Sequence, residues 1–142
     1  MGIFHIRLAN APTDFLLLSP LQPASPDSGL TSYRVNAGLH NWYFCSTCGG
    51  RCFVHRGKGE NAEVEIDGTK VKVWRPAAEG WNETTGPPPR PSYFSVNAIT
   101  LEVGPEETDL RKWHENGWVP YVENLDGQGG GPFKEPQRGG MY

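Results

Sequence analysis

The pattern of apolar and polar residues along the chain predicts short β-strands separated by turns. Two runs with regular alternation lie at 62–66 and 69–74, and Asp67-Gly68 joins them. An Asp-Gly pair between two alternating runs indicates a hairpin with a type I′ turn, because such a turn needs positive φ at both central residues. We therefore expect an antiparallel hairpin over these residues.

Shorter and less regular runs of β-forming residues predict the remaining strands. They lie at 3–8, 15–18, 33–35, 40–44, 51–55 and 93–103. Turn-forming residues predict a turn at 10–14 and loops at 19–29 and 75–92, of which the last holds five prolines. One helical turn is expected at 108–113, with Thr108 or Asp109 near its N-cap.

The composition favours an all-β fold. The 142 residues suffice for one domain, and they include 18 Gly and 13 Pro, which both interrupt helices. We expect about six to eight strands from the pattern rules. From residue 126 onward the chain is rich in Gly, Pro and Gln, so we expect a β-domain over 1–125 and a disordered tail over 126–142.

Charge and hydropathy exclude several classes of function. The formal net charge of −3 gives no electrostatic basis for binding nucleic acid. No apolar run approaches the roughly 18 residues of a membrane span, and the first residues do not resemble a secretory signal. These features predict a cytoplasmic protein with no nucleic-acid or membrane partner. The sequence also contains no Walker loop, GxGxxG, HExxH or GxSxG motif.

The most informative feature is a cluster of three cysteines, Cys45, Cys48 and Cys52. A secreted disulfide framework has more cysteines, spread more widely, so the cluster indicates metal or redox chemistry. Cys45-Ser46-Thr47-Cys48-Gly49 is the sequence of a zinc knuckle, in which a tight turn directs two thiolates at one metal. The glycine allows positive φ while backbone N–H groups face the sulfurs. We therefore predict that Cys45 and Cys48 bind zinc.

Other interpretations of the cluster stay open at this stage. One alternative is a thioredoxin-type redox pair, but such a motif should open a helix, whereas a strand is predicted after Gly49-Gly50. The plainest alternative is a turn that carries thiols without a metal. Cys52 is interpreted as a small buried apolar residue rather than a ligand. His40 and His55 are candidate further ligands, while His5 and His114 are interpreted as structural or solvated. Trp113 and Trp118 are most simply core residues, or else line a ligand groove.

Two strings give the chain a resemblance to a known family. Trp42-Tyr43-Phe44-Cys45-Ser46-Thr47-Cys48-Gly49 and the Ser-Val-Asn strand at 93–102 resemble the glutathione-dependent formaldehyde-activating enzyme family, which includes centromere protein V-like proteins. The segments 70–92 and 113–125 look like those of fungal members. The resemblance runs from about residue 1 to residue 125, most of the chain.

The resemblance implies a zinc-dependent β-tent built from small antiparallel sheets. Family members hold a structural zinc with an N-terminal Cys-x-Cys and a later knuckle, and a second, catalytic-type zinc with another cysteine cluster. Cys45 and Cys48 match the later knuckle, but no cysteine precedes Cys45 in this sequence. We therefore expect an N-terminally truncated member, or a start at an internal methionine, with an uncovered sheet edge that favours association.

The function implied by the resemblance is that of a zinc-binding β-domain from a family of carbon–sulfur lyases acting on glutathione–aldehyde adducts. The ligand would be glutathione or such an adduct. Because the catalytic-metal cysteines are absent, no catalytic residue is assigned and the chain is expected to be weakly active or inactive. The alternative is a non-catalytic, metal-stabilised binding or structural module. It would complete its zinc site as a homodimer, or with His40 or Cys52.

Overall fold

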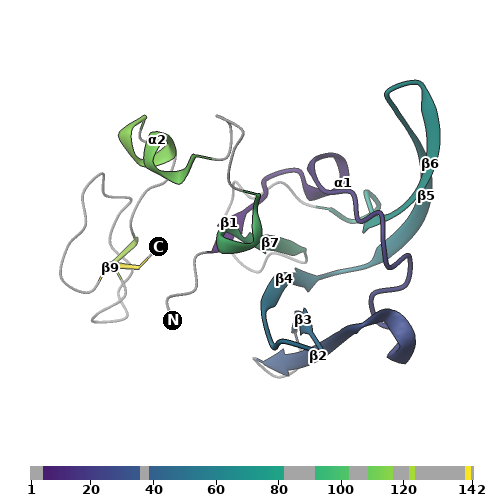
Figure 1. The fold of residues 1–142 in the computed structure, drawn as a ribbon, viewed down its shortest axis with the longest axis horizontal. Coiled ribbons are helices and arrows are strands. Elements are labelled where there is room, and N and C mark those ends of the chain that lie inside the picture. Colours follow the sequence, from purple (N-terminus) through teal and green to yellow (C-terminus); the bar gives the residue numbers. More distant parts are fainter. Residues whose placement is uncertain are drawn as a thin grey trace. The chain divides into compact units, whose positions relative to one another are not determined.

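A computed structural model of the chain describes residues 5–35, 39–81, 92–102, 109–116, 122–123 and 140–141. The described structure is mostly β, with small antiparallel sheets and short helices (Figure 1). The chain divides into two units, one formed by residues 5–97 and the other by residues 1–4 and 98–142. The described residues thus confirm the expected small antiparallel sheets, and they add short helices.

The unit formed by residues 5–97 contains seven strands and two helical turns in its described part. The strands are β1 (His5–Arg7), β2 (Leu30–Val35), β3 (His40–Cys45), β4 (Arg51–Arg56), β5 (Gly59–Ile66), β6 (Thr69–Pro76) and β7 (Tyr93–Asn97). The helical turns are α1 (Ala11–Asp14) and the 3-10 turn η1 (Pro26–Ser28).

Five of these strands form one antiparallel sheet in the order β1-β7-β4-β3-β2. The centre of the sheet is fixed by the pairs Tyr43–Phe53 between β3 and β4 and Phe53–Val96 between β4 and β7. Strand β2 pairs with β3 along its whole length and is an edge of the sheet as described. Strand β3 ends at Cys45 and β4 begins at Arg51, so the knuckle cysteines lie at the turn of the β3–β4 hairpin.

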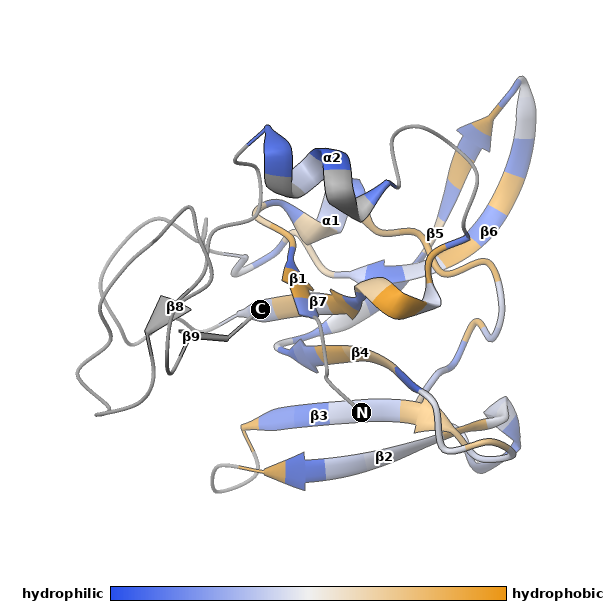
Figure 2. Cartoon of the chain, turned by 60° about the vertical axis from the view of Figure 1, so that its left-hand side comes forward, coloured by the Kyte–Doolittle hydropathy of each residue, from blue (hydrophilic) through white to orange (hydrophobic). Residues whose placement is uncertain are grey.

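The predicted Asp-Gly hairpin is confirmed. Strands β5 and β6 form a two-stranded sheet, and the turn residues Asp67 and Gly68 have φ of 50° and 76°. Hydrophilic and hydrophobic residues alternate along the hairpin (Figure 2), as expected for a ribbon with one face turned toward the protein. The base of β6 reaches the protein core, where Val73 and Trp74 are buried.

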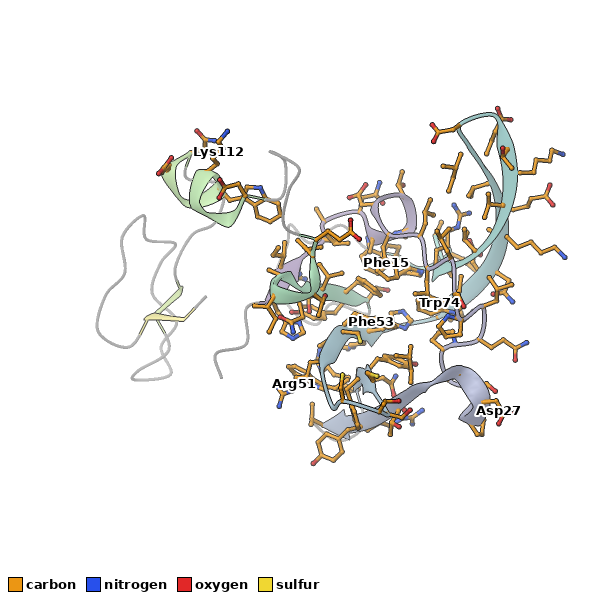
Figure 3. All side chains as sticks on the ribbon, viewed as in Figure 1. Phe15, Asp27, Arg51, Phe53, Trp74 and Lys112 are labelled. Atoms are coloured by element: carbon orange, nitrogen blue, oxygen red, sulfur yellow. The ribbon has the colours of Figure 1, made fainter. Side chains whose placement is uncertain are left out.

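The core of this unit consists of aromatic side chains packed between the five-stranded sheet and the base of the hairpin. Phe53 lies at its centre, with ring centroids 4.6 Å from Tyr43, 5.4 Å from Phe94 and 6.1 Å from Trp74. Phe15 packs against the same cluster (Figure 3). Such offset and tilted ring pairs contribute beyond their buried area, so they hold the hairpin against the sheet.

Two local predictions in the first thirty residues were wrong. In place of the plain turn expected at 10–14, Ala11–Asp14 form the single helical turn α1, since proline is compatible with a first helical turn. Residues 15–18 do not form a strand, because only Leu17 pairs with Trp74, by two backbone hydrogen bonds of 2.8 and 2.9 Å. Pro76, which would be the next hydrogen-bonded partner opposite Phe15, lacks an N–H, so the pairing does not continue in that direction.

The long strand predicted for 93–103 is also shorter than expected. Strand β7 ends at Asn97, and a 3-10 turn, η2 (Ala98–Thr100), follows it. The Asn97 side chain, at the end of β7, donates a 2.9 Å hydrogen bond to the carbonyl of Arg51, the first residue of the neighbouring strand β4. Residue 103 lies outside the described residues.

The second unit contains α2 (Leu110–Glu115), β8 (Val122–Glu123) and β9 (Gly140–Met141) in its described part, besides η2. Helix α2 confirms the helical turn expected near 108–113, and the Trp113 N–H donates to the Asp109 carbonyl over 3.2 Å. The expected disordered tail over 126–142 lies outside the described residues, except for β9, which pairs with β8. None of the helices in the described ranges has the length and apolar character that a membrane span requires.

Candidate metal centre

The Cys45–Cys48 knuckle forms a tight turn at the tip of the β3–β4 hairpin. The Gly49 N–H donates to the Cys45 carbonyl, and the Cys45 N–H donates to the Gly50 carbonyl, both over 2.9 Å. Gly49 has a φ of 70°, as expected for the glycine that reverses the chain after the second cysteine. The motif opens a strand and not a helix, which argues against the thioredoxin-type interpretation.

Backbone N–H groups point at both sulfurs of the knuckle. The Gly50 N–H donates to Cys48 Sγ over 3.4 Å. The backbone N–H groups of Cys48 and Thr47 bond to the sulfur of Cys45 and lower the pKa of its thiol. The hydrogen bonds to Cys45 stabilise its thiolate form, which is the form that ligates metals.

The knuckle is attached to the chain segment that precedes β2. The backbone N–H and the hydroxyl of Ser46 both donate to the Gly29 carbonyl, each over 3.0 Å. Gly29 has a φ of 74° and ends the turn η1. The turn that carries the cysteines is therefore held from two sides, by β3–β4 and by this corner.

Cys52 fits the interpretation as a small apolar residue better than that of a ligand. It packs against the aromatic core, and its thiol donates to the Gly50 carbonyl over 3.5 Å. Burial raises the pKa of the Cys52 thiol, and negative charge at Cys45 and Cys48 raises it further. The packing and this hydrogen bond agree with the interpretation of Cys52 as a small, partly buried residue.

The two candidate histidine ligands lie far along the strands from the knuckle. His40 is at the other end of β3, five residues from Cys45, which in an extended strand is roughly 16 Å. His55 is near the other end of β4, where it pairs with Asn41. A shared zinc needs ligand atoms about 2 Å from the metal, so neither histidine completes the site at the knuckle.

The described residues thus supply two zinc ligands, Cys45 and Cys48. Within the ranges that the structure describes, no group of three or more His, Cys, Asp or Glu side chains is arranged to hold a metal. Two preorganised thiolates suit zinc, and a structural zinc requires four ligands. The knuckle has the geometry of one half of a tetrahedral site.

Comparisons with protein-family models, with curated proteins and with solved structures found no match to this chain. The interpretation of the site therefore depends on its geometry.

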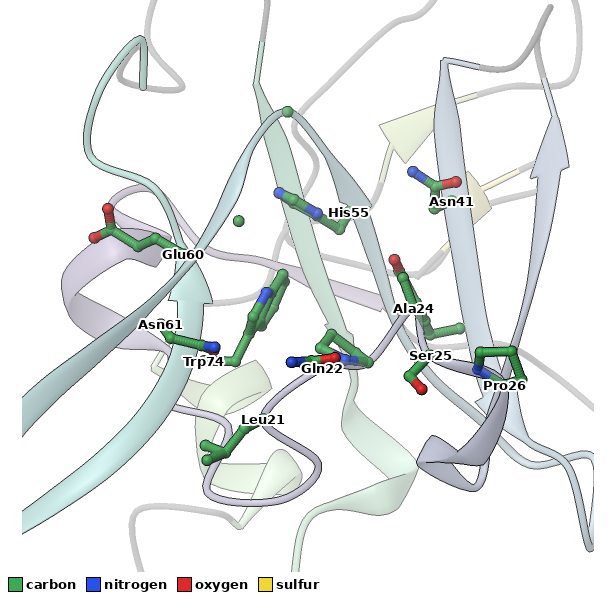
Figure 4. Close-up of a pocket in the computed structure, with 14 residues that line it drawn as sticks. Leu21, Gln22, Ala24, Ser25, Pro26, Asn41, His55, Glu60, Asn61 and Trp74 are labelled. Carbon is green, nitrogen blue, oxygen red and sulfur yellow. The ribbon is translucent and has the colours of Figure 1, made fainter.

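Sequence reasoning missed a second feature of this unit, a pocket of about 630 Å³ (Figure 4). The loop at 21–26, the strands β3 and β4 and the base of the β5–β6 hairpin form its walls. His55 and Trp74 line it, and both are buried. No local motif signals this pocket, because its residues come together only when the hairpin packs against the sheet.

The remaining histidines and tryptophans singled out in the sequence have structural contacts or lie outside the description. His5 Nδ1 is hydrogen-bonded to Ser95 Oγ at 3.1 Å, and the His5 ring packs edge-on against Trp42. This agrees with the structural role expected for His5. Trp113 lies on α2, whereas Trp118 and the side chain of His114 lie outside what the structure describes.

Proposed function

We propose that this chain is a zinc-binding β-domain whose Cys45–Cys48 knuckle supplies two of the four ligands of a structural site. The observation that carries the proposal is the set of backbone N–H groups directed at the two sulfurs. These groups hold two sulfurs on one exposed turn and favour the thiolate form of Cys45, which is the form that ligates metals. Zinc bound there would contribute directly to folding stability.

The second half of the site is best supplied by another copy of the chain. The sequence holds three cysteines, and the thiol of Cys52 is turned to the Gly50 carbonyl. Cys48 is exposed at the hairpin tip, so two knuckles can approach each other without displacing core residues. A homodimer with Cys45 and Cys48 from each copy would give a tetrahedral Cys₄ site.

The finer assignment rests on the resemblance to glutathione-dependent formaldehyde-activating enzymes. On this proposal the small antiparallel sheets are those of a zinc-stapled β-tent, and glutathione or its aldehyde adduct is the ligand class. A site saturated by four thiolates leaves no open coordination position for polarising a carbonyl or binding a substrate thiolate. The chain itself is therefore proposed to be a weak or inactive carbon–sulfur lyase, and its zinc to be structural.

The proposal is tested by metal titration of the reduced protein with Co²⁺ and Zn²⁺. We expect Co²⁺ to give the absorption of a tetrahedral thiolate complex and Zn²⁺ to displace it. Cys48→Ser should abolish this signal, whereas Cys52→Ser, a matched change four residues away, should retain it. Turnover of the glutathione–formaldehyde adduct, measured alongside, should be weak or absent. A Co²⁺ spectrum that survives Cys48→Ser would show that the knuckle is not the site.

A further inference from the structure

Strand β2 is an edge of the five-stranded sheet, and its outer side is open in the part of the chain that the structure describes. It pairs with β3 alone, and Figure 2 shows no described strand on its other side. Four successive residues of the strand, 31–34, are exposed. An exposed row of backbone N–H and C=O groups is a template for pairing with another strand. The groups on this edge therefore determine which strand it can accept.

The register of the β2–β3 pair determines which backbone groups of β2 point outward. The Ser46 N–H donates to the Gly29 carbonyl, and hydrogen-bonded pairs recur at every second residue from there. Tyr33 therefore bonds to β3, whereas its neighbours Ser32 and Arg34 direct their N–H and C=O groups away from β3. These four groups have no backbone hydrogen bond to another described residue.

The next outward-pointing residue, Leu30, is already occupied by a side chain. The Leu30 N–H donates to Ser28 Oγ over 3.1 Å, and this hydroxyl lies 3.2 Å from the Leu30 carbonyl oxygen. Ser28 belongs to the turn η1, so the chain itself closes this end of the edge. The open part of the edge thus consists of the four backbone groups of Ser32 and Arg34.

Strand β2 has few of the features that protect edge strands from pairing. It contains no lysine, proline or glycine, and its pairing with β3 has no register shift. Its one charged residue, Arg34, is turned back toward β3, where its Nε donates to Asn41 Oδ1 over 2.9 Å. In the β5–β6 hairpin, by contrast, charged side chains recur along both strands, including Glu63 and Lys72. The edge of β2 is therefore suited to a partner strand.

We propose that two copies of this chain join their β2 edges in an antiparallel, two-fold-symmetric pair, with Ser32 opposite Arg34 and Tyr33 opposite its counterpart. All four open groups of each copy are then used, in four hydrogen bonds across the junction. The two adjacent registers do not achieve this. One places Arg34 against its own counterpart, and the other needs the groups of Leu30 that Ser28 occupies. The edge is thus self-complementary in one register, which makes a second copy its occupant.

The same register matches the side chains on one face of the paired strands. Thr31, Tyr33 and Val35 share this face, because side chains alternate along a strand. Tyr33 is 64% exposed, and it meets its counterpart in a pair that is not hydrogen-bonded, where opposed side chains are closest. On either side of it, Thr31 lies opposite Val35 of the second copy. Aromatic and β-branched pairs of this kind stabilise a sheet, so the contact covers a ring that the single chain leaves in water.

This interface is distinct from the zinc-sharing contact and does not depend on it. The knuckle lies at the Leu30 end of β2, since Leu30 pairs with Cys45. With residue 32 opposite residue 34, the two Leu30 residues lie six positions apart, which is roughly 20 Å in extended strands. Two knuckles at that separation cannot share one zinc, so each remains available to a further copy.

The test is sedimentation equilibrium of the reduced full chain at pH 7.5 in EDTA, which removes any contact through zinc. We expect a reversible monomer–dimer equilibrium. Tyr33→Lys places two ammonium groups at the closest pair and should raise the dissociation constant at least tenfold. Leu18→Lys introduces the same charge at a residue that is 57% exposed and lies outside β2, and it should leave the dissociation constant unchanged. A chain that stays monomeric at millimolar concentration, or a Tyr33→Lys variant that dimerises as well as the unmodified chain, would overturn the proposal.

A charge exchange identifies the contact itself. Tyr33→Lys and Tyr33→Glu should each lose the dimer, and an equimolar mixture should regain it, because opposite charges then meet across the junction. A mixture that stays monomeric would overturn the proposal. If the metal-free chain does not fold, the same mixture is measured with zinc bound, where its native mass should exceed that of either variant alone. Zinc content is recorded in these samples, so failure of the knuckle assignment is distinguished from failure of this interface.

Discussion

The backbone N–H of Gly50 points at the sulfur of Cys48, with 3.4 Å between the two atoms. This relationship means that the sulfur is placed by the hairpin itself and not by a ligand. Together with the N–H groups that stabilise the Cys45 thiolate, it makes the knuckle a site prepared for a cation.

The first prediction concerns the loss of one ligand. Cys48→Ser should remove zinc from the protein and with it the stabilisation by binding, about 2.7 kcal/mol at a free zinc concentration one hundred times Kd. Urea unfolding with and without zinc measures this difference. In the Cys52→Ser control, the zinc-dependent gain should persist, because a hydroxyl can still donate to the Gly50 carbonyl. An unchanged zinc-dependent gain in Cys48→Ser would show that the metal binds elsewhere.

The second prediction concerns the glycine of the turn. Gly49 has a φ of 70° and open space around it, so Gly49→Ala introduces backbone strain without a clash. We expect a loss of about 1–2 kcal/mol in the free energy of unfolding, accompanied by weaker zinc binding. Gly49→Asn should lose less, because asparagine adopts the left-handed region more readily. Equal stability of all three proteins in urea unfolding would mean that this residue does not adopt positive φ in solution.

The hairpin and the knuckle were predictable because each is encoded by neighbouring residues. Asp67-Gly68 has one favourable solution between alternating strands, and Cys45 to Gly49 specify a turn of fixed length. The extents of β7 and of the segment at 15–18 were not predictable in this way. They depend on contacts between residues far apart in the sequence, such as the hydrogen bond of Asn97 to the Arg51 carbonyl and the single pairing of Leu17 with Trp74.

The pocket could not be predicted for a related reason. His55 is a polar residue in an alternating strand, and nothing next to it in the sequence indicates that it is buried. Its burial arises when Trp74, nineteen residues later, packs edge-on against it. Similarly, His40 and His55 were close to the cysteines in sequence, but extended strands carry them away from the knuckle.

The third prediction concerns the pH dependence of stability. His55 has a pKa of about 4 in the folded protein, below the value of 6.5 expected on unfolding. The unfolded chain therefore binds the additional proton between these values, and stability falls as the pH is lowered from about 6.5 toward 4. Burial also lowers the pKa values of His5 and His40, which act in the same direction.

For His55 the expected loss between pH 7.5 and pH 5 is about 2 kcal/mol. Urea unfolding of metal-free protein at the two pH values measures it, and His55→Gln is the control in which this part of the loss should vanish. If the unmodified protein and His55→Gln lose the same stability over this range, His55 is not buried as a neutral ring.

The fourth prediction concerns the packing of Trp74. A Cβ at Gly59 would overlap the indole, so Gly59→Ala should displace the ring and lower the free energy of unfolding by about 1–3 kcal/mol. Gly68→Ala is the comparison, because at that residue φ is 76° but no atom lies within 4 Å. Both variants lose stability, but only Gly59→Ala should shift the indole N–H signal of Trp74 in an NMR spectrum. An unshifted signal in Gly59→Ala would contradict the packing.

The central claim, that two copies of the Cys45–Cys48 knuckle share one zinc, is tested most directly by zinc content and mass measured on the same sample. Reduced protein is loaded with zinc and separated by size, and then its zinc per chain and its native mass are determined. We expect one zinc for every two chains in a dimer. One zinc per chain in a monomer would contradict the sharing of the site, and a protein that retains no zinc would contradict the metal centre itself.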